Sequence, residues 1–165
     1  ALERLDLEKA LVAAKLALCQ PDFPPVCHAV VGKIYAQMGL YDRASQFLTT
    51  YIDMFPGDYH ERCQLGLVLF RSGDEEGALL VWEQALQYDK THPPVLFYLA
   101  HAHAAKQSWS TAQRFIDILL TAAGSENLFS IKAQQLRTWI NEATASPGKK
   151  ELNWPTDLND ELLFG

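Results

Sequence analysis

The sequence predicts an all-α fold built from antiparallel helix pairs that stack in chain order, and three observations support this. Small and apolar residues recur every 34 positions along the 165-residue chain. Within each period the apolar residues are three and four positions apart, which is the spacing of one helix face. Glycine, proline or polar residues stand between these segments, where helices end or begin. A fixed period of this length is typical of repeat proteins, in which each unit buries its apolar face against the next.

Four columns of residues share the period of 34. Two columns contain only glycine or alanine, and the other two contain large or branched apolar residues. The columns are Gly32, Gly66 and Ala100; Ala44, Ala78 and Ala112; Val31, Leu65 and Leu99; and Leu48, Trp82 and Ile116. We interpret the small residues as the points where two helices of a pair approach closely, with the large residues filling the space beside them.

The first helix pair shows how each element is predicted. Residues 27–38 carry one apolar stripe that includes Val31 and Tyr35, and Gly39 then interrupts the pattern. Residues 41–55 resume it with apolar residues at spacings of three and four. Pro56-Gly57 ends this second helix, because proline cannot continue a helical hydrogen-bond ladder.

The remaining helices follow from the same signals. The second pair spans 62–71 and 76–88 around Gly73-Asp74, and the third spans 95–106 and 110–122 around Gln107-Ser108. Helices are also predicted at 3–19, before the first pair, and at 127–143, after the third.

This pattern resembles the tetratricopeptide repeat, a 34-residue helix pair with a small residue at its eighth position, alanine at its twentieth and a large apolar residue at its twenty-fourth. The four columns include these three positions. The aromatic residue of the eleventh position is kept only at Tyr35, and the proline of the thirty-second only at Pro56, so the match is degenerate. The resemblance implies an α-solenoid, a right-handed superhelix of helix pairs.

The resemblance also divides the chain. Three units are expected at 25–58, 59–92 and 93–126. Residues 1–24 are expected to hold the second helix of an incomplete earlier unit, because Ala10, Ala14, Ala17 and Leu18 fall on that helix's packing positions. Residues 127–144 are expected to cap the stack. Residues 145–165 are expected to form a linker and an acidic, apolar tail.

Composition narrows the classes of function. A formal charge of −6 and a pI near 5.3 argue against nucleic-acid binding, which needs a basic surface.

Cys19, Cys27 and Cys63 lack metal-site spacing, so we expect reduced thiols and a cytoplasmic protein. The chain opens with Ala1, which leaves an upstream signal or anchor, and a periplasmic or membrane-anchored location, open. No apolar run is long enough to span a membrane. No phosphate loop or nucleophile motif is present, so we expect no enzyme activity, cofactor or metal.

In the tetratricopeptide family the first helix of each pair lines the inner face of the superhelix, where peptides bind. The resemblance assigns that role here to Lys33, Gln37, His60, Cys63, Leu67, Phe70, Arg71, Phe97 and His101. No acidic residue is among them. We therefore expect a peptide or protein partner with apolar anchors and some negative charge. The alternative is that these positions are apolar only because neighbouring helices crowd there.

The tail, residues 151–165, is expected to dock on a helical surface, either of its own chain or of a neighbouring one. It combines four acids and no base with exposed-looking apolar residues, which is too apolar for an inert solvated segment. The docking residues are expected to be Leu152, Trp154, Leu158, Leu162 and Phe164. The alternative is a hydrophobic lid over the last helix.

The sequence thus favours a non-catalytic adaptor or scaffold module. One alternative is a translocator chaperone of type III secretion, which the number of units, the length and the acidic pI resemble. Another is a self-assembling structural unit that forms homo-oligomers through the incomplete N-terminal unit or the tail.

Overall fold

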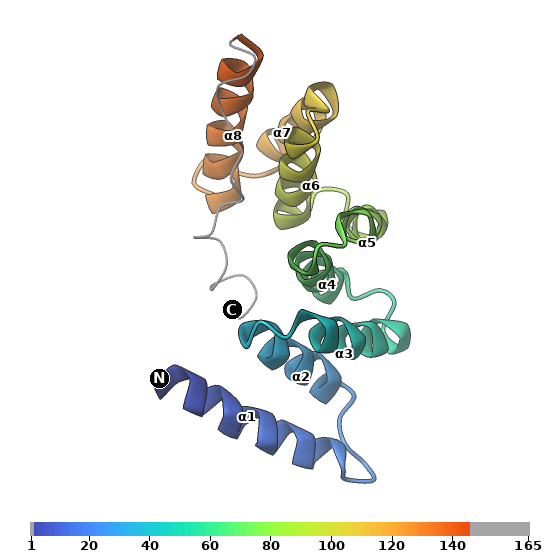
Figure 1. The fold of residues 1–165 in the computed structure, drawn as a ribbon. Coiled ribbons are helices and arrows are strands. Elements are labelled where there is room, and N and C mark those ends of the chain that lie inside the picture. Colours follow the sequence, from blue (N-terminus) through green and yellow to red (C-terminus); the bar gives the residue numbers. More distant parts are fainter. Residues whose placement is uncertain (1, 146–165) are drawn as a thin grey trace. The chain divides into compact units, whose positions relative to one another are not determined.

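The computed structural model describes residues 2–145, and this part of the chain consists of helices and short turns without a strand. Its helices, drawn in chain order in Figure 1, are α1 (Leu2–Leu18), α2 (Val26–Gln37), α3 (Tyr41–Met54), α4 (Tyr59–Ser72), α5 (Glu75–Tyr88), α6 (Pro93–Ala105), α7 (Trp109–Ala122) and α8 (Leu128–Ala145). Each lies within three residues of its predicted range. The predicted helix positions and the all-α fold are therefore confirmed, and the superhelical stacking stays a prediction.

The chain divides into two compact units within α5, between Val81 and Trp82. The first unit contains α1 to α4 and the start of α5. The second contains the rest of α5 together with α6, α7 and α8.

In the first unit, neighbouring helices pack side by side in chain order, α1 on α2, α2 on α3 and α3 on α4 (Figure 1). The side chains of α2, α3 and α4 form one apolar core. Its buried members include Val31, Tyr35, Leu48, Ile52 and Val68. The apolar positions predicted from the period are thus the ones that exclude water, which is the dominant favourable contribution to folding.

Gly32 explains why one column contains only small residues. A Cβ atom at this position would lie 2.9 Å from Leu48 Cγ and 3.2 Å from the carbonyl oxygen of Ala44. Both contacts belong to α3, so α2 and α3 approach each other through this glycine. A larger side chain would push the two helices of the pair apart.

The turns inside the pairs repeat the same period in their backbone. Gly39, Gly73 and Gln107, each 34 residues after the last, have φ values of 72°, 94° and 59°. At each turn the next residue's N–H donates to the carbonyl of the residue five positions earlier, at 2.9 to 3.0 Å. This is the Schellman arrangement, which ends a helix by satisfying its free carbonyls and needs one left-handed residue. The period of the sequence is therefore also a period of turn geometry.

The second unit is organised around α6, which is buried on all sides from Val95 to Ala102. A helix that is apolar all round is an interior helix, and both α7 and α8 pack against it. Aromatic pairs hold the neighbours in place, with ring centroids 5.4 Å apart for Trp82 and Tyr98 and 5.9 Å apart for Trp109 and Trp139.

Candidate ligand-binding surface

Charge is distributed unevenly between the two kinds of helix in the predicted pairs. The first helices, α2, α4 and α6, carry three bases against one acid, a net charge of +2. The second helices, α3, α5 and α7, carry two bases against six acids, a net charge of −4. The bases of the first helices are Lys33, Arg62 and Arg71, and their one acid is Glu61. Although the chain is acidic, only one acidic residue lies on α2, α4 and α6, the helices on which the sequence predicts ligand contact.

In the first unit, seven of the residues of α2 and α4 that remain accessible define what we term the α2–α4 surface. Four are exposed and three are half-buried. The surface consists of Val26, Val30, Lys33 and Gln37 on α2 and His60, Phe70 and Arg71 on α4. Five of the nine predicted contact residues belong to it. The two apolar and one aromatic side chains could hold apolar anchors of a ligand, and the cationic groups could hold an acidic one.

An ion pair between Lys33 Nζ and a Glu61 carboxylate oxygen joins α2 to α4. The side chain of Glu61 is 10% exposed and that of Lys33 is 27% exposed. The second carboxylate oxygen, Oε2, is buried without a hydrogen-bond partner. Glu61 therefore neutralises the charge that Lys33 was expected to offer to a ligand.

Arg71 lies near the end of α4 and reaches the first residue of α3. One of its guanidinium nitrogens, Nη1, donates to the hydroxyl of Tyr41 at 3.2 Å. The hydroxyl carries no charge, so the positive charge of Arg71 is not neutralised by this contact. A shallow depression beside it has a mixed lining of turn residues, an acid and a second base. It is lined by Gly39 and Leu40 of the turn, Tyr41, Asp42 and Arg43 of α3, and Arg71 and Ser72 of α4. Arg71 can thus present charge to a ligand at one end of the surface.

The structure buries Cys63 and Leu67, two further predicted contact residues of α4. Burial strongly raises the pKa of the Cys63 thiol, and the nearby charge of Glu61 raises it further. The thiol is therefore protonated at neutral pH and is a poor nucleophile or metal ligand.

Phe97 and His101, the last two predicted contact residues, belong to the second unit and are also buried. Their ring centroids lie 6.2 Å apart on α6. His103 is half-buried, with its ring stacked on Phe115 at 5.7 Å. Desolvation lowers the pKa of His103. The rings of Phe97, His101 and His103 therefore pack inside the second unit.

Val26 and Val30 of this surface are not among the nine predicted contact residues, and neither is Glu61, the buried partner of Lys33. Val30 is exposed, and it lies between Val26 and Lys33 at helical spacing, so the same periodicity could have identified it. Glu61 is 28 positions from its partner Lys33, and no local pattern links the two.

Three further predictions concern the tail, metal binding and membrane spans. The tail residues Leu152, Trp154, Leu158, Leu162 and Phe164 lie outside the described residues. Within residues 2–145, no cluster of three His, Cys, Asp or Glu side chains could hold a metal ion. None of the helices in that range combines the length and the apolar character needed to cross a bilayer.

Comparison with models of known protein families finds no match for this chain, and comparison with curated proteins finds no relative. The tetratricopeptide resemblance therefore stays a prediction, carried by the repeated columns and turns.

Proposed function

We propose that the chain is a tetratricopeptide-type interaction module without catalytic activity, which binds a peptide or a partner protein along the α2–α4 surface. The observation that carries the proposal is the separation of charge between helix types. In a chain with a net charge of −6, the only acid on α2 and α4 is Glu61, and it is buried in an ion pair. The exposed part of these helices is apolar, aromatic and cationic.

The chemistry of this surface specifies its ligand. Val26 and Val30 offer an apolar strip on α2, and Phe70 offers an aromatic face on α4. Arg71 keeps its charge, which favours an acidic side chain or a carboxyl terminus. An extended or helical peptide with apolar anchors and at least one acid fits all of these features. Electrostatic attraction would mainly set specificity and association rate, and the apolar contacts would supply most of the affinity.

A matched pair of substitutions tests the proposal. Gln37 on α2 and Gln46 on α3 are both exposed residues of the first unit, and only Gln37 belongs to the α2–α4 surface. A peptide array that varies acidic and apolar content would first identify a binding sequence. Fluorescence anisotropy of that peptide with the full chain would then compare Gln37→Glu with Gln46→Glu.

We expect Gln37→Glu to weaken binding by about threefold to tenfold, because it adds a negative charge beside the acidic ligand. Gln46→Glu, which changes the net charge equally, should leave affinity unchanged. The proposal fails if no acidic, apolar peptide binds, or if both variants weaken binding to the same extent. Addition of salt should weaken the interaction, since exposed charges are screened.

A further inference from the structure

The tail of the chain has the chemistry that the α2–α4 surface is proposed to bind. From residue 151 onward the sequence contains four acids and no base, and Lys149 and Lys150 precede it. Apolar residues are interspersed with the acids, and Leu158 and Leu162 stand four positions apart. The chain therefore includes a peptide that combines apolar anchors with acidic groups.

We propose that the tail, residues 151–165, binds the α2–α4 surface of its own chain and competes there with the partner peptide, so that the surface is autoinhibited. This inference rests on the proposed function, because it uses the same surface. The 20 residues after α8 can span up to roughly 70 Å when extended. The helices α2 and α4 have 12 and 14 residues and are about 18 and 21 Å long. The segment is thus long enough to lie along either helix.

Charge attracts the tail to this surface. Together α2 and α4 carry three bases and one acid, and that acid, Glu61, is buried in its ion pair with Lys33. Asp42 and Arg43, which line the depression beside Arg71, have opposite charges, so the excess of positive charge remains. A segment with four negative charges is complementary to such a surface.

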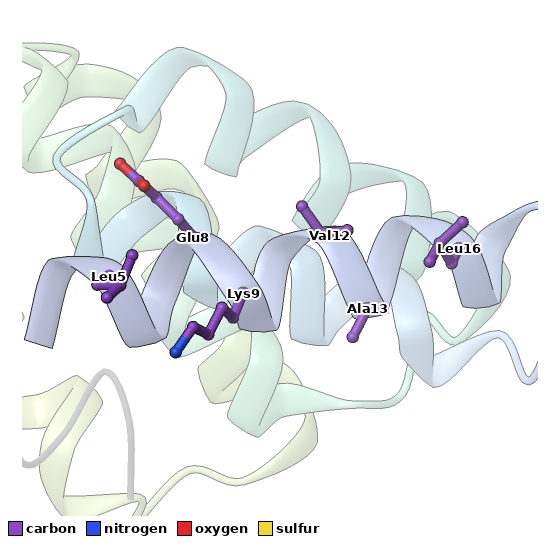
Figure 2. Close-up of a pocket in the computed structure, with 6 residues that line it drawn as sticks. All are labelled: Leu5, Glu8, Lys9, Val12, Ala13 and Leu16. Atoms are coloured by element: carbon purple, nitrogen blue, oxygen red, sulfur yellow. The ribbon is translucent and has the colours of Figure 1, made fainter.

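The exposed face of α1 is a second apolar surface of the first unit, and it lacks this excess charge. A shallow depression on this face (Figure 2) is lined by Leu5, Glu8, Lys9, Val12, Ala13 and Leu16. The charges of Glu8 and Lys9 oppose each other, and α1 as a whole carries three acids and three bases. This face therefore offers an acidic segment no electrostatic advantage.

The last helix, α8, is also a weaker site for the tail. Its cation Arg137 is already paired with Asp117 of α7. The two remaining charged residues of α8, Lys132 and Glu142, have opposite signs. Charge therefore favours the α2–α4 surface over the alternative in which the tail covers the last helix.

The size of the expected effect follows from the competition between the tail and an external ligand. A short flexible connection gives a tethered segment an effective concentration of about 1 mM. For a separate tail peptide with a Kd of about 100 µM, the tethered tail leaves the surface open in about one-tenth of the molecules. An external ligand then binds about tenfold more weakly than it would bind an open surface.

The test measures the affinity of an external peptide by fluorescence anisotropy. The peptide is an acidic, apolar sequence from the array, which is screened with the wild type and with a chain that ends at Lys150. In the full chain, Leu158→Ser with Leu162→Ser removes two anchors of the tail without changing its charge. The control is Leu5→Ser with Leu16→Ser, which replaces two exposed leucines of α1. Circular dichroism verifies that the shortened chain keeps its helices.

We expect both tail variants to bind the external peptide about tenfold more tightly than the wild type, and the control variant to match the wild type. A synthetic peptide of residues 151–165 should bind the shortened chain. Gln37→Glu in that chain should weaken this binding by about threefold to tenfold, and Gln46→Glu should leave it unchanged. The wild type should sediment as a monomer, because the contact is within one chain.

Equal affinities of the wild type and both tail variants would overturn the inference and leave the proposed function intact, provided that Gln37→Glu still weakens binding of the external peptide. If Gln37→Glu does not affect the tail peptide, the tail binds elsewhere and the inference fails. A wild-type dimer that the tail variants dissociate would place the tail on a second copy, which also contradicts it. If neither the wild type nor the shortened chain binds any acidic, apolar peptide, the proposed function itself fails.

Discussion

The ion pair between Lys33 and Glu61 should respond unequally to the loss of its two members. The pair links α2 to α4, with 27% of the Lys33 side chain and 10% of the Glu61 side chain exposed. Lys33→Met removes the only hydrogen-bond partner that the Glu61 side chain has among the described residues, and Oε2 already lacks one. Glu61→Gln removes the acid's charge and keeps its shape and one acceptor oxygen.

The expected losses in the free energy of unfolding follow from how deeply each of the two side chains is buried. Breaking a fully buried pair costs about 3 to 5 kcal/mol, and an exposed pair is worth about 0 to 1 kcal/mol. Lys33→Met strands a nearly buried carboxylate, so we expect a loss of about 3 kcal/mol. Glu61→Gln leaves a lysine that is already partly in water, so we expect a loss of about 1 kcal/mol. The double variant leaves no buried unpaired charge and should lose about 2 kcal/mol, less than the sum of the two single losses.

Urea denaturation followed by circular dichroism measures the free energy of unfolding of the four proteins, and their double-mutant cycle gives the coupling energy. Equal losses in the two single variants would contradict the assignment of Glu61 as the more buried partner. Additive losses would show that the two side chains do not interact in solution.

Three further perturbations test the repeat geometry and the second unit by the same measurement. Gly39→Ala and Gly73→Ala should each lower the free energy of unfolding by about 1 kcal/mol, because their φ values of 72° and 94° are unfavourable for a residue with a Cβ atom. Gln107→Gly should raise it by up to about 1 kcal/mol, because Gln107 has a φ of 59°. Equal effects of all three substitutions would contradict the turn assignment. Gly32→Val should lower the free energy of unfolding by about 2 kcal/mol or more, because even a Cβ atom at this position would lie 2.9 Å from Leu48 Cγ. An unchanged free energy of unfolding would mean that α2 and α3 are not closely packed. Burial lowers the pKa of His103 below its ordinary value of 6.5, so the unfolded chain binds that proton first and stability should fall as pH decreases below 6.5. His103→Phe should flatten this part of the pH profile, and an unchanged slope would contradict the burial of the ring.

Periodicity predicts helices well here because each column has a direct steric or hydrophobic cause. Gly32 is small because α3 approaches it, and Leu48 and Trp82 are large because they fill the adjacent core. The start of α4 shows the limit of this approach. Apolar spacing placed it at residue 62, whereas the helix begins at Tyr59, after Asp58, whose carboxylate accepts a hydrogen bond from the N–H of Glu61 at 3.1 Å. The capping residue, and not the apolar pattern, determines that boundary.

The candidate site was less predictable, because its properties depend on contacts between distant residues. Position in the repeat identified Lys33 and Arg71 equally well as cationic contact residues. The structure distinguishes them, since an acid 28 positions away neutralises Lys33, and a neutral hydroxyl 30 positions away contacts Arg71. Likewise, repeat position alone does not distinguish exposed His60 from buried Cys63.

These two cations imply a direction for the proposed ligand. A carboxylate near Lys33 would have to compete with Glu61, which is covalently fixed in place and already paired. A carboxylate near Arg71 would have to displace a phenol hydroxyl, which is a weaker acceptor for a guanidinium group than a carboxylate, and Asp42 lines the same depression without an ion pair to Arg71. At the other end of α2, Val26 and Val30 are exposed, and no Asp, Glu, Lys or Arg of that helix precedes Lys33. The ligand's acidic group should therefore lie toward the end of α4 and its apolar anchors toward the start of α2. Because the ion pair between Lys33 and Glu61 leaves Arg71 as the cation that a ligand can use, this pair sets the orientation in which a peptide binds.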